Sequence, residues 1–291
     1  MQSPAEGEQP MQTILKGTGR EVIISPEHPT VIIGERINPT GRKVFSVELQ
    51  AGNLSRIPQD ALAQVQAGAA VLDVNVGAAG VDEVRLLPLA VQMVQEVVDV
   101  PVCIDSPNPQ ALAAALKVVK GRALVNSVNG EEERLRAVLP VVAEYGAAVI
   151  GLCMDDDGIP TDPEARVAIA EKILTRAEAA GIKPQDVIID PLVLTIGADH
   201  RAVLTTLTTA GMIRTALGSN LTAGASNASH GMPDRELLNT VFLTGLIQAG
   251  VNAPICNPLK NALAVRAADL MLGRDEMGMN YIMTFRQHQQ Q

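Results

Sequence analysis

Carboxylate and carboxamide side chains follow nearly every short apolar run of this sequence. They are Glu35, Asn38, Asp73, Asn75, Asp105, Asn126, Asn129, Asp190, Asn227 and Asn257. A carboxylate accepts two parallel N–H bonds, and a carboxamide donates and accepts hydrogen bonds without carrying a charge. Lysines are scarce at these positions, and no pair of histidines occurs there. The residue types therefore predict a site for a neutral, hydrogen-bonding heterocycle, and not for a phosphate or a tightly held metal.

Each of these side chains also has a simpler interpretation. An Asp directly after a strand often caps the next helix, and Asp105 in DSPNP or Asp190 in DPL could belong to a turn. The acids Asp155 to Asp157 are expected to form a solvated loop, and His230 to have a surface or supporting role. The case for a site is collective, because chance would not place acids and amides after nearly every run.

The apolar runs themselves predict buried parallel strands. The eight runs are residues 30–33, 71–74, 101–104, 123–126, 148–152, 187–190, 221–224 and 253–256. Each is too short for a buried helix, and each is rich in β-branched or small residues. Because helical patterns separate them, we expect an α/β fold, a (β/α)8 TIM barrel with its chemistry at the C-terminal strand ends. An open doubly wound sheet is the alternative, but GERINPTG after the first run does not match its phosphate-binding GxGxxG pattern.

Apolar residues at helical spacing mark the segments between the runs. One stripe occupies positions 84, 87, 91, 94 and 98, and another occupies positions 135, 138, 142 and 145. Asn108 before Pro109 predicts a helix start, and Gly146 and Gly181 predict helix ends. These signals agree with an alternation of strands and helices.

The chain is expected to divide into three parts. Residues 1–29 form an N-terminal extension, in which TILKGTGREVIIS (13–25) predicts a β-hairpin with a glycine turn. Residues 30–280 form the barrel, whose N-terminal mouth the hairpin could plug. Residues 281–291 form a flexible tail, and both the first ten residues and the final RQHQQQ are expected to fray.

Charge and composition exclude several classes of partner. The 291 residues carry a formal net charge of −9, which disfavours nucleic acid and anionic membranes, and only 2% are aromatic, which leaves few side chains to stack on bases. No apolar run is long enough to cross a bilayer, and MQSPAEGEQP lacks the features of a signal peptide. The separated cysteines Cys103, Cys153 and Cys256 are expected to be small core residues in a reducing cytoplasm.

Six motifs, in order and at barrel spacing, resemble the pterin-binding methyltransferase family. This family includes methyltetrahydrofolate:corrinoid protein methyltransferases and the folate domain of cobalamin-dependent methionine synthase. The motifs are IIGERINPTG, LDVNVG, CIDSPN, VNSVNG, IDPL and GASNASHG, and the resemblance runs from about Val31 to Leu272. It implies a (β/α)8 barrel, usually a homodimer, that acts on tetrahydrofolate in one-carbon metabolism. His230 departs from the Phe that this family often has after SNAS.

The resemblance also implies roles for individual residues. The residues that would bind the pterin are Asp73, Asn75, Asp105, Asn126, Asp190, Ser226 and Asn227. Asp190 would hold the aminopyrimidine edge. Asn227 would face N5, the nitrogen that carries the methyl group, with Ser226 supporting it. Asn227 and Asp105 would be the catalytic residues.

The implied reaction moves a methyl group between N5 of tetrahydrofolate and the cobalt of a corrinoid such as cobalamin. Because a tertiary amine is a poor leaving group, N5 must gain a proton, or a hydrogen bond toward one, as its bond to the methyl breaks; such assistance is worth ~10²–10⁴ in rate. The sequence has no DxHxxG segment of a cobalamin-binding module. The corrinoid is therefore expected on a partner protein, in a demethylase or one-carbon pathway, and no tightly bound metal is expected.

Two other functions remain open. Dihydropteroate synthase shares the fold and the pterin, but that family uses a Lys near the end of strand seven and an Arg–His pair near the end of strand eight. The corresponding ends read GASN and CNPLKN in this sequence. A non-catalytic folate-binding protein would keep the site without turning over.

Overall fold

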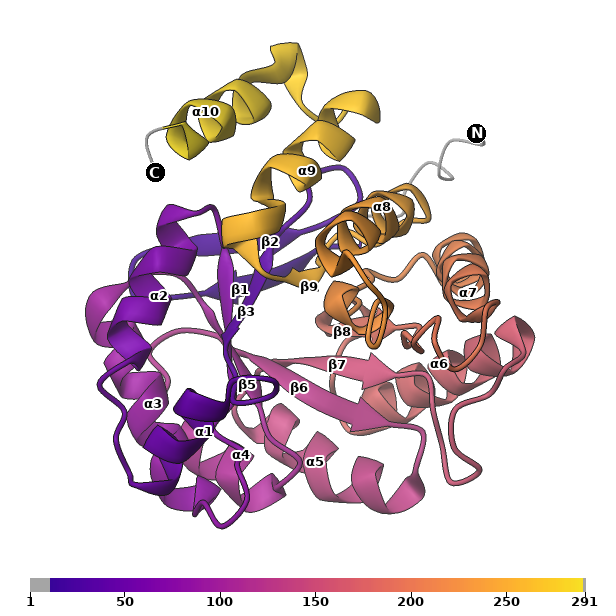
Figure 1. Ribbon diagram of the computed structural model, residues 1–291. Coiled ribbons are helices and arrows are strands. Elements are labelled where there is room, and N and C mark those ends of the chain that lie inside the picture. Colours follow the sequence, from indigo (N-terminus) through magenta and orange to yellow (C-terminus); the bar gives the residue numbers. More distant parts are fainter. Residues whose placement is uncertain (1–10, 290–291) are drawn as a thin grey trace.

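The computed structural model describes residues 11–289, and its centre is a ring of parallel strands surrounded by helices (Figure 1). The strands of the ring are β3 (Ile33–Ile37), β4 (Val71–Val74), β5 (Val102–Asp105), β6 (Leu124–Asn129), β7 (Ala148–Leu152), β8 (Val187–Asp190) and β9 (Ile255–Cys256). They pair in the order β8-β7-β6-β5-β4-β3-β9, and every pair is parallel. Neighbours in sequence are neighbours in space because each helix returns outside the ring.

The LTAG segment, the seventh of the predicted runs, closes the ring between β8 and β9. Leu221 forms a parallel bridge with Ile189, and Gly224 forms one with Ile255. A regular strand was expected here, and the structure corrects this expectation. The N–H of Leu221 donates to the side chain of Asn252 at 3.0 Å, so an amide side chain replaces one bond of a strand ladder. The (β/α)8 barrel thus has seven regular strands and one segment that pairs through isolated bridges.

Helices cover the outside of the ring (Figure 1). They are α1 (Lys43–Gln50), α2 (Ile57–Gln66), α3 (Glu83–Val97), α4 (Pro109–Leu116), α5 (Glu132–Glu144), α6 (Pro163–Ala179), α7 (Ala202–Leu217), α8 (Arg235–Gln248), α9 (Pro258–Met271) and α10 (Met279–His288). The two predicted apolar stripes fall on α3 and α5. Asn108 caps α4 by accepting the N–H of Gln110 at 2.9 Å. Gly146 follows α5 with a φ of 59°, the left-handed conformation that glycine adopts at helix ends.

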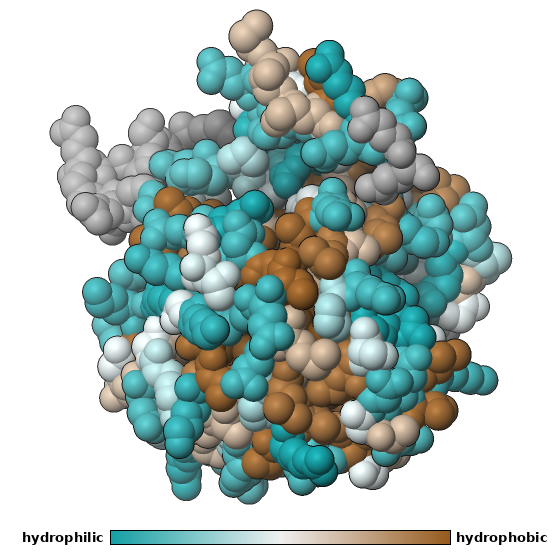
Figure 2. Space-filling model, turned by 90° about the vertical axis from the view of Figure 1, so that its left-hand side faces the viewer, coloured by the Kyte–Doolittle hydropathy of each residue, from teal (hydrophilic) through white to brown (hydrophobic). Residues whose placement is uncertain are grey.

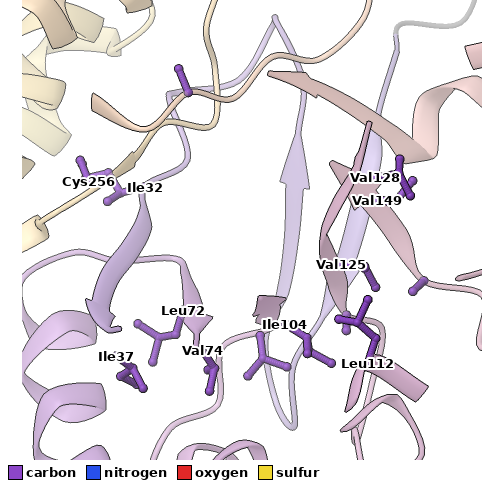
Figure 3. Close-up of a cluster of buried hydrophobic side chains, with 14 of the residues drawn as sticks. Ile32, Ile37, Leu72, Val74, Ile104, Leu112, Val125, Val128, Val149 and Cys256 are labelled. Carbon is purple, nitrogen blue, oxygen red and sulfur yellow. The ribbon is translucent and has the colours of Figure 1, made fainter. Parts of the chain in front are cut away.

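Two apolar cores lie on opposite sides of the strands. Successive residues of a strand point to opposite faces, so Leu72 and Val74 pack outward against the helices while Val71 points into the barrel. Figure 3 shows the outer cluster, with Ile104 and Val125 from the next two strands beside them. Burial on both faces explains why the strands are nearly continuous apolar runs.

The predicted hairpin is confirmed and closes the N-terminal end of the barrel. Strands β1 (Thr13–Lys16) and β2 (Glu21–Ile24) pair antiparallel. The side chains of Leu15, Val22 and Ile24 are buried in the inner core, together with the inward-facing residues of the barrel strands. This end of the barrel is therefore filled with apolar side chains.

Two buried amides tie the hairpin to the barrel. Asn220 Nδ2 donates to Thr13 Oγ1 and to the carbonyl of Ile24, both at 2.9 Å. Asn220 Oδ1 accepts from Asn252 Nδ2 at 2.8 Å, and Asn252 Oδ1 accepts from the Leu221 N–H. Both amides are buried with every polar atom of their side chains used, which removes the cost of burying them.

The C-terminal residues differ from the tail expected over 281–291. Residues 281–288 belong to α10, which packs on α9. Asp275 holds the start of this helix by accepting the N–H groups of Asn280 and Tyr281 at 3.0 and 2.9 Å. Tyr281 and Phe285, one turn apart, stack with ring centroids 6.4 Å apart. The first ten residues and residues 290–291, for which fraying was predicted, lie outside the described part of the chain.

The side of the molecule that carries α2 and α3 has a mixed surface. Figure 2 shows hydrophobic residues (brown) gathered in the middle of this side, with hydrophilic residues (teal) around them. Exposed apolar side chains on α1, α2 and α3 include Val47, Leu62 and Leu89. Between residues 11 and 289, every helix is too short or too polar to cross a bilayer.

Candidate active site

A cavity of about 630 Å³ opens at the C-terminal ends of the barrel strands. Its lining comes from the ends of β3 to β9, from the segment that follows Gly224, and from the first turns of α8 and α9. This is the end at which TIM barrels carry their sites, and the volume suits a small organic molecule.

The floor of the cavity consists of the last inward-facing residues of the strands. On β4, Val71 lies in the inner core, and Asp73 follows it on the same face and reaches the cavity. The same spacing of two residues links Cys103 to Asp105, Leu124 to Asn126 and Ile188 to Asp190. A polar layer therefore lies directly on the apolar layer that the hairpin closes from the other end.

Two carboxyl groups of this floor, Asp73 and Asp105, interact electrostatically, which affects their pKa values. Asp105 accepts a 2.8 Å bond from Asn75 Nδ2, and Asp73 accepts a 3.3 Å bond from Asn126 Nδ2. Burial raises the pKa of Asp105 to about 6. Burial, and then repulsion from Asp105, holds the pKa of Asp73 well above its usual value. The pair therefore carries less than its full charge near neutral pH, which suits an uncharged ligand with N–H donors.

The third floor carboxyl, Asp190, is held by the turn that follows β8. Its Oδ1 accepts the N–H of Leu192 at 2.8 Å, and Leu192 has a φ of 64°, uncommon for a leucine. The buried guanidinium of Arg166 fixes this turn by donating to the carbonyls of Pro191 (2.7 Å), Leu192 (2.9 Å) and Pro160 (2.7 Å). Burial raises the pKa of Asp190 to about 7. A ligand that donates two N–H bonds would favour its ionised form.

Ser226 and Asn227 lie in a short 3-10 turn on the wall of the cavity. Ser226 Oγ donates to Glu35 Oε1 at 2.6 Å. Burial raises the pKa of Glu35, while this hydrogen bond acts in the opposite direction. The amide of Asn227 lies over Gly224, where a Cβ would come within 3.0 Å of Asn227 Nδ2. The absence of a side chain at Gly224 thus leaves room for the amide of Asn227.

Several residues of the site were not predicted. Arg235 on α8 lines the cavity and donates to the carbonyl of Ser226 at 3.0 Å and to Ser229 Oγ at 3.1 Å. It follows a turn instead of a strand, so the strand-end pattern did not include it. Glu35 was noted as a strand-end acid without a role. Arg166 lies on α6, on the outer side of the barrel, where no pattern marked it.

The structure brings six of the seven predicted pterin-binding residues into this one cavity. They are Asp73, Asp105, Asn126, Asp190, Ser226 and Asn227. The seventh, Asn75, touches Asp105 through the bond described above. His230 lines the exposed rim, and Asp155 forms a tight loop with Gly158 away from the lining. The individual roles of these residues stay predictions.

Three buried thiols lie close to the acids of the cavity, and their predicted place in the core is confirmed. Burial, and then the charge of Asp73, raises the pKa of Cys103 well above its usual value. Burial likewise raises the pKa of Cys153, beside Asp190, and of Cys256. In residues 11–289, no group of three or more His, Cys, Asp and Glu side chains is placed to hold a metal ion.

Comparison with known proteins decides the family. The pattern described as "Pterin binding enzyme" matches residues 34–257. The chain belongs to the pterin-binding enzymes. A methylcorrinoid:tetrahydrofolate methyltransferase of Eubacterium limosum is 32% identical over 265 residues, which cover 88% of this chain and 96% of that protein.

Other similar proteins are longer or more distant in sequence. A methionine synthase of Mycobacterium leprae is 31% identical over 248 residues, which cover 80% of this chain but 21% of that protein. A Mycobacterium tuberculosis methionine synthase is 30% identical over 243 residues, 79% of this chain and 20% of that protein. The structure of a Yersinia pestis DHPS with a pterine-sulfa conjugate superposes with a TM-score of 0.65 at 17% identity, covering 89% of this chain and 98% of that one. This likeness shows the shared fold.

Proposed function

We propose that this protein is a methyltransferase that moves a methyl group between N5 of tetrahydrofolate and the cobalt of a corrinoid. The observation that carries the proposal is the cavity floor, where Asp73, Asp105, Asn126 and Asp190 converge from four strands without an ion pair to any Lys or Arg of the described chain. Such a floor favours a neutral ligand that presents several N–H donors, as the aminopyrimidine ring of a folate does. The Eubacterium methyltransferase, which matches over 96% of its length, supports the same activity.

Asp190 is our choice for the aminopyrimidine edge. Its Oδ1 is engaged by the Leu192 N–H, and the rest of the carboxylate faces the cavity. A ring N–H and its neighbouring amino group would supply two parallel bonds and offset the burial of the charge. Asp105 and Asn126, adjacent in register on β5 and β6, would hold the other polar atoms of the pterin.

Asn227 is our choice for the residue that faces N5. When the methyl leaves N5 as a methyl cation equivalent for cobalt, N5 keeps the electron pair of the broken bond and takes up a proton. In the opposite direction, N5–H loses its proton as the methyl arrives. An amide can accept from N5–H and donate to the lone pair of N5 without changing its own charge. Ser226, Glu35 and Arg235 would keep this turn in place, since each belongs to the hydrogen-bond chain beside it.

The corrinoid would arrive on a partner protein and dock at the open rim of the cavity. The similarity to the methylcorrinoid:tetrahydrofolate methyltransferase of Eubacterium limosum supports a methylcorrinoid substrate. From the family resemblance we also propose a homodimer and a cytoplasmic location. We propose further that residues 1–29 form an extension and that residues 30–280 form the barrel.

The test is turnover with methylcobalamin and tetrahydrofolate, in both directions, for the protein and its Asn227→Ala variant. Loss of a group that stabilises developing charge costs about 10²–10³ in turnover. We expect a loss of this size, with the dissociation constant of methyltetrahydrofolate changed far less. Asn53→Ala, at an exposed asparagine outside the cavity lining, is the control and should behave as the wild type.

The outcomes separate the competing functions. Folate binding without turnover in the wild-type protein would support a non-catalytic folate-binding role. Normal turnover in Asn227→Ala would remove the assignment of this residue to N5 and leave the methyltransferase itself intact.

A further inference from the structure

The part of the cavity between β3, α8 and α9 contains polar atoms that the pterin floor does not use. Asn261 on α9 is 4% exposed and lines the cavity. Its Nδ2 donates to the carbonyl of Asn257 at 3.2 Å, one turn earlier. Its buried Oδ1 has no hydrogen-bond partner among the described residues. Since the nitrogen already has an acceptor, rotating the amide would only exchange one unmade bond for another.

A second amide of the cavity lining also has a buried oxygen without a hydrogen-bond donor. Asn239 on α8 also lines the cavity, and its Oδ1 is buried without a partner in the described part of the chain. Helix α9 packs against both α8 and β3, so the two amides belong to one corner of the cavity. A buried acceptor left without a donor costs about 1–3 kcal/mol, and two of them in one corner indicate that a donor arrives from outside.

Arg36 on β3 supplies the complementary group. It lines the same cavity, and its guanidinium makes no ion pair or hydrogen bond within residues 11–289. The other long cations of the lining are engaged: Arg42 pairs with Asp60 at 2.6 Å, Lys260 pairs with Glu236 at 2.5 Å, and Arg235 is bonded as described above. Burial, and then repulsion from Arg42, lowers the pKa of Arg36, while the charges of Asp60 and Glu35 act in the opposite direction. This partly buried charge therefore has acids in its surroundings but no direct partner among the described residues.

Two acceptors and one cationic donor specify the chemistry of the missing group. A carboxylate would satisfy Arg36 but face the oxygens of Asn239 and Asn261 without a proton to give them. An ammonium would satisfy the oxygens but face Arg36 as a like charge. An amide has both an N–H donor and a carbonyl acceptor, and it carries no charge.

We propose that Arg36, Asn239 and Asn261 form an amide-binding subsite of the methyl-transfer cavity. This inference rests on the proposed function, because both substrates of that reaction carry amides. The corrin ring bears primary carboxamide side chains around its edge, and folate bears one secondary amide that joins its benzoyl group to glutamate. The subsite would orient one of the two substrates relative to Asn227.

The experiment compares the wild-type protein with Asn261→Leu, Asn239→Leu and Arg36→Met. Three quantities are measured: the dissociation constant of methyltetrahydrofolate, that of a 5-methyl-tetrahydropterin without the benzoylglutamate tail, and the KM for methylcobalamin. One hydrogen bond to an uncharged group is worth about 3- to 10-fold in affinity. Gln248→Leu, at an exposed amide on α8 outside the cavity lining, is the matched control. Thermal unfolding identifies any variant that fails to fold, and Asn239 is the safer site because it is only partly buried.

The pattern of losses identifies the source of the amide. A 3- to 10-fold weaker binding of the intact folate, with the truncated pterin unaffected, assigns the subsite to the benzoylglutamate amide. A raised KM for methylcobalamin with unchanged folate binding assigns it to a corrin carboxamide. Unchanged values throughout, or equal losses for the truncated pterin, overturn the proposal. Absence of turnover and folate binding in the wild-type protein would instead refute the proposed function, so the two failures are distinguishable.

Discussion

Buried amides occur at both ends of the barrel, and the two ends treat them in opposite ways. At the N-terminal end, Asn220 and Asn252 satisfy each other and the hairpin with every polar atom of their side chains. At the C-terminal end, Asn239 and Asn261 each keep one buried oxygen unpaired within the described chain. Completed networks stabilise a fold, whereas unmade bonds and unpaired acids lower its stability and are available to a ligand. One end of the molecule therefore supplies stability, and the other holds the substrate.

The largest effect is expected from Asp190→Asn, which should move stability and binding in opposite directions. The folded-state pKa of Asp190, about 7, lies above its usual 3.8. Between pH 3.8 and about 7, the folded protein therefore holds a proton on Asp190 that the unfolded chain releases. The stability that the protonated form contributes is lost as pH rises through this range. At about 1.4 kcal/mol for each pH unit, the loss is roughly 4 kcal/mol at most. Asparagine cannot ionise and retains the acceptor for the Leu192 N–H.

We therefore expect urea unfolding at pH 8 to show a more stable variant, with the difference vanishing near pH 4. Calorimetry should show methyltetrahydrofolate binding weakened about 10- to 100-fold, the value of hydrogen bonds to a charged group. Asp157→Asn, at an exposed acid outside the cavity lining, is the control. If the Asp190→Asn variant bound folate with unchanged affinity, or were less stable than the wild type at pH 8, the C-terminal end would not exchange stability for binding.

Leu15→Ala should affect stability alone. The fully buried side chain of Leu15 closes the N-terminal end, and truncating a buried leucine costs about 3 kcal/mol. Folate affinity should stay unchanged, since the pterin floor lies at the opposite end. Leu62→Ala, at a leucine that is 40% exposed, should change the free energy of unfolding much less. A weaker folate affinity without a loss of stability would show that the two ends are not independent.

The smallest effect is expected from Arg166→Lys, which tests how the C-terminal end of the barrel holds Asp190 in place. Lysine lacks the fork that reaches three carbonyls, so the turn beneath Asp190 loses at least one bond. We expect the KM for the folate substrate to rise about 3- to 10-fold, as for one lost hydrogen bond. The KM for methylcobalamin and kcat should not change, whereas general loosening of the fold would shift all three. Arg176→Lys, on the same helix and paired with Glu132, is the control.

The periodicity of the sequence was sufficient to predict the barrel, the hairpin and the floor of the site. A short apolar run with Asp73 or Asp190 at or next to its last position fixes both the strand and the face on which the acid emerges, because side chains alternate along a strand. The regularity failed at Leu221, where the side chain of Asn252 replaces a backbone partner from a distant part of the chain. It also failed at α10, where packing on α9 supports a helix in a sequence that looked like a tail.

The residues that were missed depend on contacts between distant elements. Arg235 reaches the site from a helix, and its role is visible only once the turn at Ser226 lies beside it. Arg166 acts on a turn 25 residues away through backbone carbonyls, which carry no sequence signal. Local patterns can place a side chain on a strand end, but they do not show which side chain completes its hydrogen bonds.

The thiols near the acids of the cavity have a consequence for a protein that handles an activated methyl group. A sulfur atom becomes a good nucleophile as a thiolate, and a thiolate beside the transferring methyl would capture it irreversibly. Burial and the neighbouring carboxyl groups keep Cys103 and Cys153 protonated. Burial, with the acids of the floor acting in the same direction, therefore also protects the chain against alkylation by its own substrate.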